Sequence, residues 1–126
     1  MIKFIQTTDA PAAIGPYSQA VNIGELIYTS GQIALKPDGS FLDGDIKEQS
    51  IQVLTNLANV LKAGRSSLNQ VIKTTIFLVN MDDFVEVNKI YEKFFGSHKP
   101  SRSTVAVKTL PKNALIEIEV IAQIKN

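Results

Sequence analysis

The most regular hydrophobic pattern in the chain covers residues 115–124. Apolar and polar residues alternate there, with Ile116, Ile118, Val120, Ala122 and Ile124 on one side and Glu117, Glu119 and Gln123 on the other. Successive side chains of a β-strand point to opposite faces of its sheet. The pattern therefore predicts a strand with one apolar face against the core and one polar face.

Other segments also have the composition of strands. Residues 20–23 and 26–29 are short apolar runs joined at Gly24-Glu25, which favours a hairpin. Residues 71–79 are rich in β-branched side chains and too apolar for a surface strand, so we expect an interior strand. Residues 102–107 follow Pro100 and are predicted to be extended, and a turn is predicted at residues 110–113.

Two segments instead show helical spacing with start and stop signals. Asp45 can cap the first helix and Glu48 follows three residues later, a pattern typical of a capping box, while Gly64 provides the stop. Asn80 can cap the second helix, and Gly96 ends it. The apolar stripes are Ile46, Val53, Leu54, Leu57, Val60 and Leu61 in the first helix, and Phe84, Val87, Tyr91, Phe94 and Phe95 in the second.

The predicted element order is β-β-α-β-α-β-β in a single domain over residues 1–126. Each amphipathic helix needs one apolar surface to cover, and a mixed sheet with both helices on one face provides it. We therefore predict an α+β two-layer sandwich. The opposite face of the sheet carries Ser, Thr, Glu and Arg among aliphatic residues, which suits a subunit interface.

Composition narrows the possible functions. The 126 residues include no cysteine, which excludes disulfides, thiolate nucleophiles and cysteine metal sites. A formal charge of +1 with both signs scattered provides no broad basic field, so no nucleic-acid partner is expected. No apolar run reaches the ~20 residues of a membrane span, and the N-terminal residues lack a signal-peptide core. We expect a cytoplasmic protein with no membrane partner.

Few residues remain that could carry chemistry. His98, the only histidine, has no second histidine nearby, so a solvated loop is a better interpretation than a metal site. Arg102 opens an extended segment, where its planar fork could bind a carboxylate or form a structural salt bridge. Glu117 could act as an acid or base, or Glu117 and Glu119 could be a solvated face. If residues 102–107 and 115–124 form an antiparallel hairpin, Arg102 lies close to Glu117.

Several blocks of the sequence have counterparts in a known family. They are residues 12–19 (AAIGPYSQ), 29–33 (TSGQI), 71–78 (VIKTTIFL), 88–95 (NKIYEKFF), 100–105 (PSRSTV) and 110–119, which contains LP and ends in IEIE. In this order they resemble the RidA/YjgF family of reactive-intermediate deaminases, and together they cover nearly the whole chain.

The resemblance implies a chorismate-mutase-like fold and a homotrimer with clefts between neighbouring subunits. It implies hydrolysis of 2-iminobutanoate and 2-iminopropanoate to 2-oxo acids and ammonia, with neither metal nor cofactor. By the same resemblance Arg102 would bind the substrate carboxylate, helped by the backbone N–H of Gly31, and Glu117 would activate the attacking water. Tyr17, Ser30 and Asn88 would line the pocket.

One position departs from the family pattern. Thr104 stands where many relatives have cysteine. In the family this position acts largely through its backbone carbonyl, which threonine also has, so we expect activity to survive. Branches of the family without the arginine lack the deaminase activity, and Arg102 places this chain with the active branch. The alternative is a non-catalytic trimer that binds small 2-oxo acids, amino acids or partner proteins.

Overall fold

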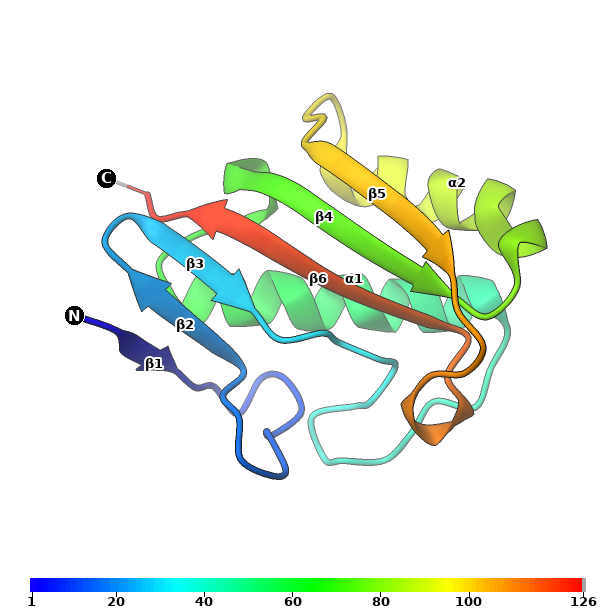
Figure 1. Ribbon diagram of the computed structural model, residues 1–126, viewed down its shortest axis with the longest axis horizontal. Coiled ribbons are helices and arrows are strands. Elements are labelled where there is room, and N and C mark those ends of the chain that lie inside the picture. The colour runs from blue at the N-terminus through cyan, green and yellow to red at the C-terminus, as the bar shows by residue number, and fades with distance from the viewer. Residues whose placement is uncertain (126) are drawn as a thin grey trace.

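The computed structural model describes residues 1–125. Its helices and strands, in chain order, are β1 (Lys3–Ile5), β2 (Ala20–Ile23), β3 (Leu26–Thr29), α1 (Ile46–Ala63), β4 (Val71–Leu78), α2 (Phe84–Phe95), β5 (Ser101–Ala106) and β6 (Ile116–Gln123). Short 3-10 turns lie at Leu68–Gln70, Met81–Asp83 and Pro111–Asn113. The strands form one mixed sheet in the order β1-β2-β3-β6-β4-β5, and both helices lie on the same face of it (Figure 1). The predicted α+β two-layer sandwich is confirmed.

The ends of α1 follow the signals in the sequence. Asp45 accepts a hydrogen bond from the backbone N–H of Glu48, and the Glu48 side chain accepts one from the N–H of Asp45, which completes the capping box. Gly64 is the C-terminal cap, as predicted. A Cβ on Gly64 would lie 2.7 Å from Ile5 Cδ1 and 2.8 Å from Ile27 Cδ1, so this glycine allows the helix end to pack closely against the sheet.

The start of α2 differs slightly from the prediction. Asn80 accepts from the backbone N–H of Asp82, but it caps the short 3-10 turn that precedes the helix. The α-helix itself spans Phe84–Phe95, and Gly96 caps its C-terminal end with a positive φ of 61°, which glycine adopts easily.

Two features of the sheet were not expected. The three residues of β1 pair with β2, although only Ile5 is buried and so short a run carries no alternation. The hairpin on which the proximity of Arg102 and Glu117 was conditional does not form, because β4 lies between β5 and β6. Strand β5 runs parallel to β4 because α2 connects the two strands and returns the chain in the same direction.

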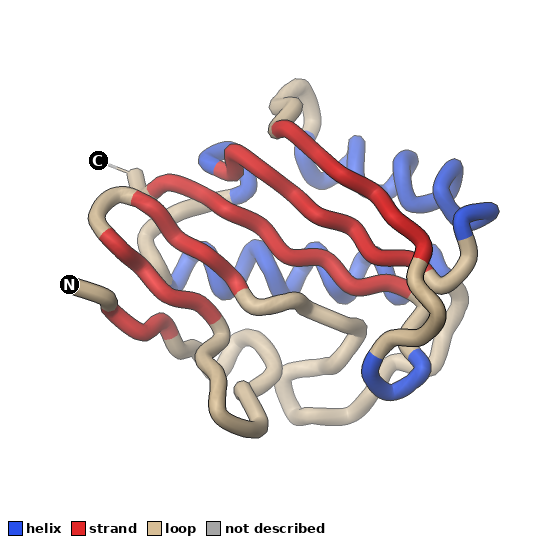
Figure 2. Tube along the Cα trace, in the orientation of Figure 1, coloured by secondary structure: helices blue, strands red, loops and turns tan. Residues whose placement is uncertain are grey.

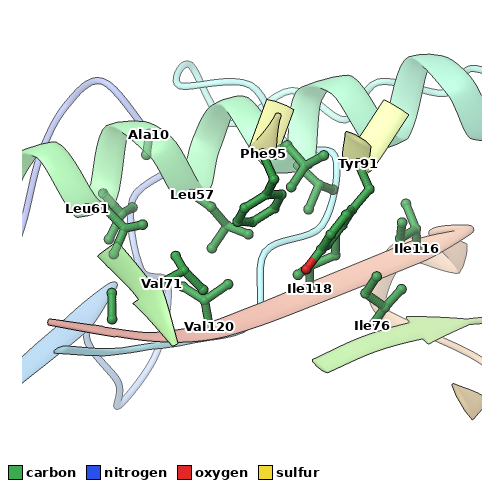
Figure 3. Close-up of a cluster of buried hydrophobic side chains, with 14 of the residues drawn as sticks. Ala10, Leu57, Leu61, Val71, Ile76, Tyr91, Phe95, Ile116, Ile118 and Val120 are labelled. Atoms are coloured by element: carbon green, nitrogen blue, oxygen red, sulfur yellow. The ribbon is translucent and has the colours of Figure 1, made fainter. Parts of the chain in front are cut away.

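The hydrophobic core lies between the sheet and the two helices (Figure 3). Leu57 and Leu61 of α1 and Ile76, Ile118 and other strand residues are fully or nearly fully buried there. The alternation in β6 predicts one apolar side that faces the core. The buried positions of β6 lie on that side, which confirms the prediction.

Within residues 1–125, no helix covers the other face of the sheet. The pairing of β1, β2, β3 and β6 aligns Phe4, Val21, Tyr28 and Ile121 in one apolar row across this face. Phe4 is 77% exposed and Tyr28 is 43% exposed. We refer to this side as the open face. It carries a contiguous row of apolar side chains that a single chain leaves uncovered.

Candidate functional site

Arg102 lies on β5 opposite Thr74 of β4, on the face of the sheet that the helices cover. Its guanidinium lies over the rings of Phe84, at 5.4 Å from the centroid, and Tyr91, at 5.0 Å. Arg102 Nη1 donates a hydrogen bond of 2.8 Å to Asn88 Oδ1. Three residues of α2 thus hold the guanidinium, and the remaining N–H donors of its planar fork are available to a ligand.

A structural salt bridge was the alternative role for this arginine. Within residues 1–125, the only ion pair with an N···O distance up to 4.0 Å joins Lys89 and Glu86. Arg102 therefore has no carboxylate partner within this part of the chain. The positive charge on an exposed and partly held side chain is suited to an external anion.

A cleft of about 320 Å³ extends from Arg102 along α2 and the loop that follows it, and Asn88, Tyr91 and His98 are among its lining residues. His98 is half-buried, and its Nε2 lies 2.7 Å from the carbonyl oxygen of Val71. Gly96, Ser97 and Lys99 of the predicted solvated loop are exposed, but the His98 ring connects this loop to the start of β4. Residues 1–125 contain no group of three or more His, Cys, Asp or Glu side chains that could hold a metal ion.

Glu117 lies in a different cleft. It pairs with Phe77 of β4 and points to the open face. The cleft has a volume of about 540 Å³, and Tyr17, Ser30 and Gly31 also line it. Burial raises the pKa of the Glu117 carboxyl, and the nearby carboxylate of Glu119 raises it further. A carboxyl with a raised pKa is a stronger base when ionised and a usable acid when protonated.

The close packing of Gly31 and Glu117 follows from an isolated bridge between the chain after β3 and β6. Gln32 N–H donates to Ile118 O at 2.9 Å, and Ile118 N–H donates to Gln32 O at 3.1 Å. A Cβ on Gly31 would overlap the Glu117 carboxylate and lie 2.8 Å from its Cδ. The absent side chain therefore makes room for that carboxylate.

The backbone N–H of Gly31 donates to no acceptor within the described residues 1–125. Ser30 has a different role from Gly31, because its Oγ donates to Ser18 O at 2.5 Å and is engaged in holding the neighbouring loop. Tyr17, on that loop, is 56% exposed. The long loops that carry these residues lie along one end of the sheet (Figure 2).

The structure thus separates the predicted site residues into two groups. Tyr17, Ser30 and Gly31 lie with Glu117, whereas Asn88 lies with Arg102. The two groups are on opposite faces of the sheet, so Arg102 and Glu117 are not close within one chain. Their proximity was conditional on a hairpin between β5 and β6, and strand order and register decide which face each side chain occupies.

Thr104 belongs to neither cleft in a single chain. It lies on β5, two residues beyond Arg102 and therefore on the same face of the sheet. Its Oγ1 is buried and has no hydrogen-bond partner among residues 1–125.

Sequence reasoning missed the aromatic surroundings of Arg102. Phe84, Asn88 and Tyr91 recur at i, i+4 and i+7, so they share one side of α2. From the sequence, Phe84 and Tyr91 are assigned to the apolar stripe that packs on the core, and only Asn88 to the pocket.

Comparisons with known proteins agree with this fold. A family model described as Endoribonuclease L-PSP matches residues 7–124. The 2-iminobutanoate/2-iminopropanoate deaminase of Mus musculus is 47% identical over 121 residues, which cover 95% of this chain and 90% of that protein. A Lactococcus lactis protein with the provisional name regulator AldR is 51% identical over 126 residues, covering 99% of this chain and all of that one.

A solved structure extends the likeness to three dimensions. The crystal structure of E. coli TdcF with bound serine has a TM-score of 0.92 to this chain and 39% sequence identity, and the match covers 98% of this chain and 99% of that one.

Within residues 1–125, no helix combines the length and the apolar character needed to cross a bilayer.

Proposed function

Because the chain belongs to the Endoribonuclease L-PSP family, which is the RidA/YjgF family that its sequence resembles, we propose that it hydrolyses 2-imino acids to 2-oxo acids and ammonia. The substrates proposed are 2-iminobutanoate and 2-iminopropanoate, the pair in the name of the mouse relative. The observation that carries the proposal is that one chain presents both Arg102, which has no carboxylate partner within residues 1–125, and Glu117, a half-buried glutamate whose pKa is raised.

In this proposal Arg102 binds the substrate carboxylate. One N–H of its fork is engaged by Asn88, and the others can form charge-assisted hydrogen bonds to the two carboxylate oxygens. The N–H of Gly31, which donates to no acceptor within residues 1–125, supplies a further donor to the same carboxylate. Binding through this fixed end of the substrate positions C2 and its imine nitrogen for attack.

Glu117 acts on water. Its ionised carboxylate takes a proton from water as the water oxygen bonds to C2 of the protonated imine, and the C=N π electrons neutralise the nitrogen to give a carbinolamine. The carboxyl then returns this proton to the nitrogen. As the C–N bond breaks and ammonia leaves, an oxygen lone pair forms the C=O bond of the 2-oxo acid and the carboxylate takes the remaining hydroxyl proton, which passes to the ammonia as ammonium. The raised pKa of Glu117 suits both steps, because it brings the proton affinity of the carboxyl closer to the working pH.

One substrate can contact both residues only if they come from different subunits, since Arg102 and Glu117 lie on opposite faces of the sheet in one chain. We therefore place the site between neighbouring subunits of a homotrimer. The apolar row of Phe4, Val21, Tyr28 and Ile121 on the open face is a suitable surface for that contact, because burying it removes exposed apolar area from water.

A coupled assay tests the proposed activity. A threonine dehydratase generates 2-iminobutanoate in situ, and release of ammonia is followed with and without this protein. The proposal predicts release faster than spontaneous hydrolysis, in proportion to the concentration of the protein. An unchanged rate at every protein concentration would contradict it.

The alternative function is a trimer that binds small 2-oxo or amino acids without turnover. Two comparisons favour it: the structure of E. coli TdcF contains a bound serine, and the Lactococcus lactis relative is named as a regulator. The same Arg102 grip would serve that role. The coupled assay separates the two functions, because a binder would reduce the free imino acid stoichiometrically and would not accelerate ammonia release.

A further inference from the structure

The residues around Arg102 form a closed arrangement that joins three elements. Arg102 on β5 is the direct register partner of Thr74 on β4. Thr74 Oγ1 lies 3.0 Å from the hydroxyl of Tyr91 on α2, and this hydrogen bond is buried. The Tyr91 ring in turn lies under the Arg102 guanidinium, at 5.0 Å from the centroid.

Both partners of the buried hydrogen bond are held firmly. Thr74 is fully buried at 0% exposure, and Tyr91 is 9% exposed. Tyr91 also stacks on Phe95 one turn further along α2, with centroids 4.3 Å apart. Its hydroxyl reaches from α2 down to the strands in Figure 3.

A hydroxyl pair is an unusual choice for this layer of the core. Phe in place of Tyr91 and Val in place of Thr74 would fill nearly the same volume without burying two polar groups. The hydrogen bond instead fixes the angle and height of the Tyr91 ring relative to β4. Since β5 is attached to β4 at Thr74, it also fixes the ring relative to the strand that carries Arg102.

We propose that the Thr74–Tyr91 pair positions Arg102, by setting the ring surface on which the guanidinium rests while Asn88 holds one N–H. The inference rests on the proposed function, because the purpose of the arrangement is to present the remaining donors to a carboxylate. Tyr91 and Thr74 are positioning residues that act through Arg102, and neither contacts the reacting atoms.

Three variants separate the contribution of the Thr74–Tyr91 hydrogen bond from that of the Tyr91 ring. Thr74→Val and Tyr91→Phe each remove the same hydrogen bond and keep the packing volume, whereas Tyr91→Leu removes the ring as well. Ser66→Ala is the matched control, because Ser66 is also buried and donates a tertiary hydrogen bond of 2.7 Å, to Gln123 O at the end of β6. It reproduces the loss of a buried hydroxyl without touching Arg102.

Two measurements are made on the intact protein. Calorimetry gives the Kd of 2-oxobutanoate, the carboxylate product, and NMR gives the chemical shift of the Arg102 Nε–H, which a ring below the guanidinium displaces upfield. We expect Thr74→Val and Tyr91→Phe each to weaken binding about two- to fivefold, and Tyr91→Leu about tenfold, with loss of the upfield shift. KM for the imino acid should rise by the same factors while kcat changes little. The reason is that hydrogen bonds to the carboxylate stabilise the bound substrate and the transition state equally.

The double variant Thr74→Val/Tyr91→Phe should bind 2-oxobutanoate no more weakly than either single variant does, because each single substitution already removes the same hydrogen bond. Ser66→Ala should lower Tm and leave Kd and the Arg102 resonance unchanged. Unchanged Kd and unchanged resonance in Thr74→Val and Tyr91→Phe would overturn the inference. A wild-type protein that neither binds 2-oxobutanoate nor hydrolyses the imino acid would contradict the proposed function instead, and the Arg102 resonance would then decide the positioning role alone.

Discussion

Arg102 and Glu117 occupy opposite faces of one sheet, separated by strand β4. Arg102 pairs with Thr74 on the helix-covered face, and Glu117 pairs with Phe77 on the open face. If Arg102 binds the substrate carboxylate and Glu117 is the acid and base, as proposed, these two side chains of one chain cannot act on the same small substrate. The separation gives the proposed two-subunit site its physical basis.

Arg102→Lys keeps the charge but loses the planar two-pronged donor. We expect kcat/KM to fall at least about tenfold, because each charge-assisted hydrogen bond lost costs about 1.5–3 kcal/mol. Tm should change little, since the side chain is exposed and has no ion-pair partner in residues 1–125. Measuring both on one preparation checks the assignment. A lower Tm with normal kcat/KM would instead indicate a structural arginine.

Glu117→Gln should keep substrate binding and remove most turnover, because an amide has a similar shape but cannot accept the proton from water. Glu119→Gln is the control, since Glu119 is the neighbouring carboxylate on the same face of β6. Steady-state kinetics of the two variants check the assignment. Equal, wild-type rates in both would identify a merely solvated acidic face.

The raised pKa of Glu117 also predicts how stability depends on pH. Between the ordinary glutamate value of 4.5 and the higher pKa in the folded chain, the folded state binds more protons than the unfolded state. Stability is therefore lost as pH rises through this window. Glu117→Gln should melt above the wild type at pH 7, and the difference should shrink as pH falls towards 4.5. A Tm difference that does not vary with pH would be inconsistent with burial of the charged carboxylate.

The end of α1 predicts two opposite effects on stability. Arg65 has φ of 63° at the position after the Gly64 cap, so Arg65→Gly should relieve strain and raise the free energy of unfolding by about 0.5–1 kcal/mol. Gly64→Ala should lower it by about 1–3 kcal/mol, because the new Cβ would meet Ile5 and Ile27. Urea denaturation of both variants measures the two changes. Stabilisation by Gly64→Ala would contradict the packing role of Gly64.

Local patterns in the sequence were enough for most of the elements. The alternation in β6 and the capping box at Asp45 each depend on residues close together in the chain, and the structure confirms both. Strand order depends on which distant segments pair. The short connection between β5 and β6 suggested a hairpin, but the crossover through α2 places β5 beside β4. The face on which Arg102 lies follows from that pairing and could not be found from local pattern.

The central claim, a site shared between subunits, can be measured by complementation. Arg102→Ala and Glu117→Gln are each assayed alone and then mixed in equal amounts, unfolded together and refolded. A site needs an intact Arg102 from one subunit and an intact Glu117 from its neighbour, so random assembly should restore about a quarter of the wild-type specific activity. Activity in the mixture no greater than that of the two separate variants would show that both residues act from one chain and would contradict the account.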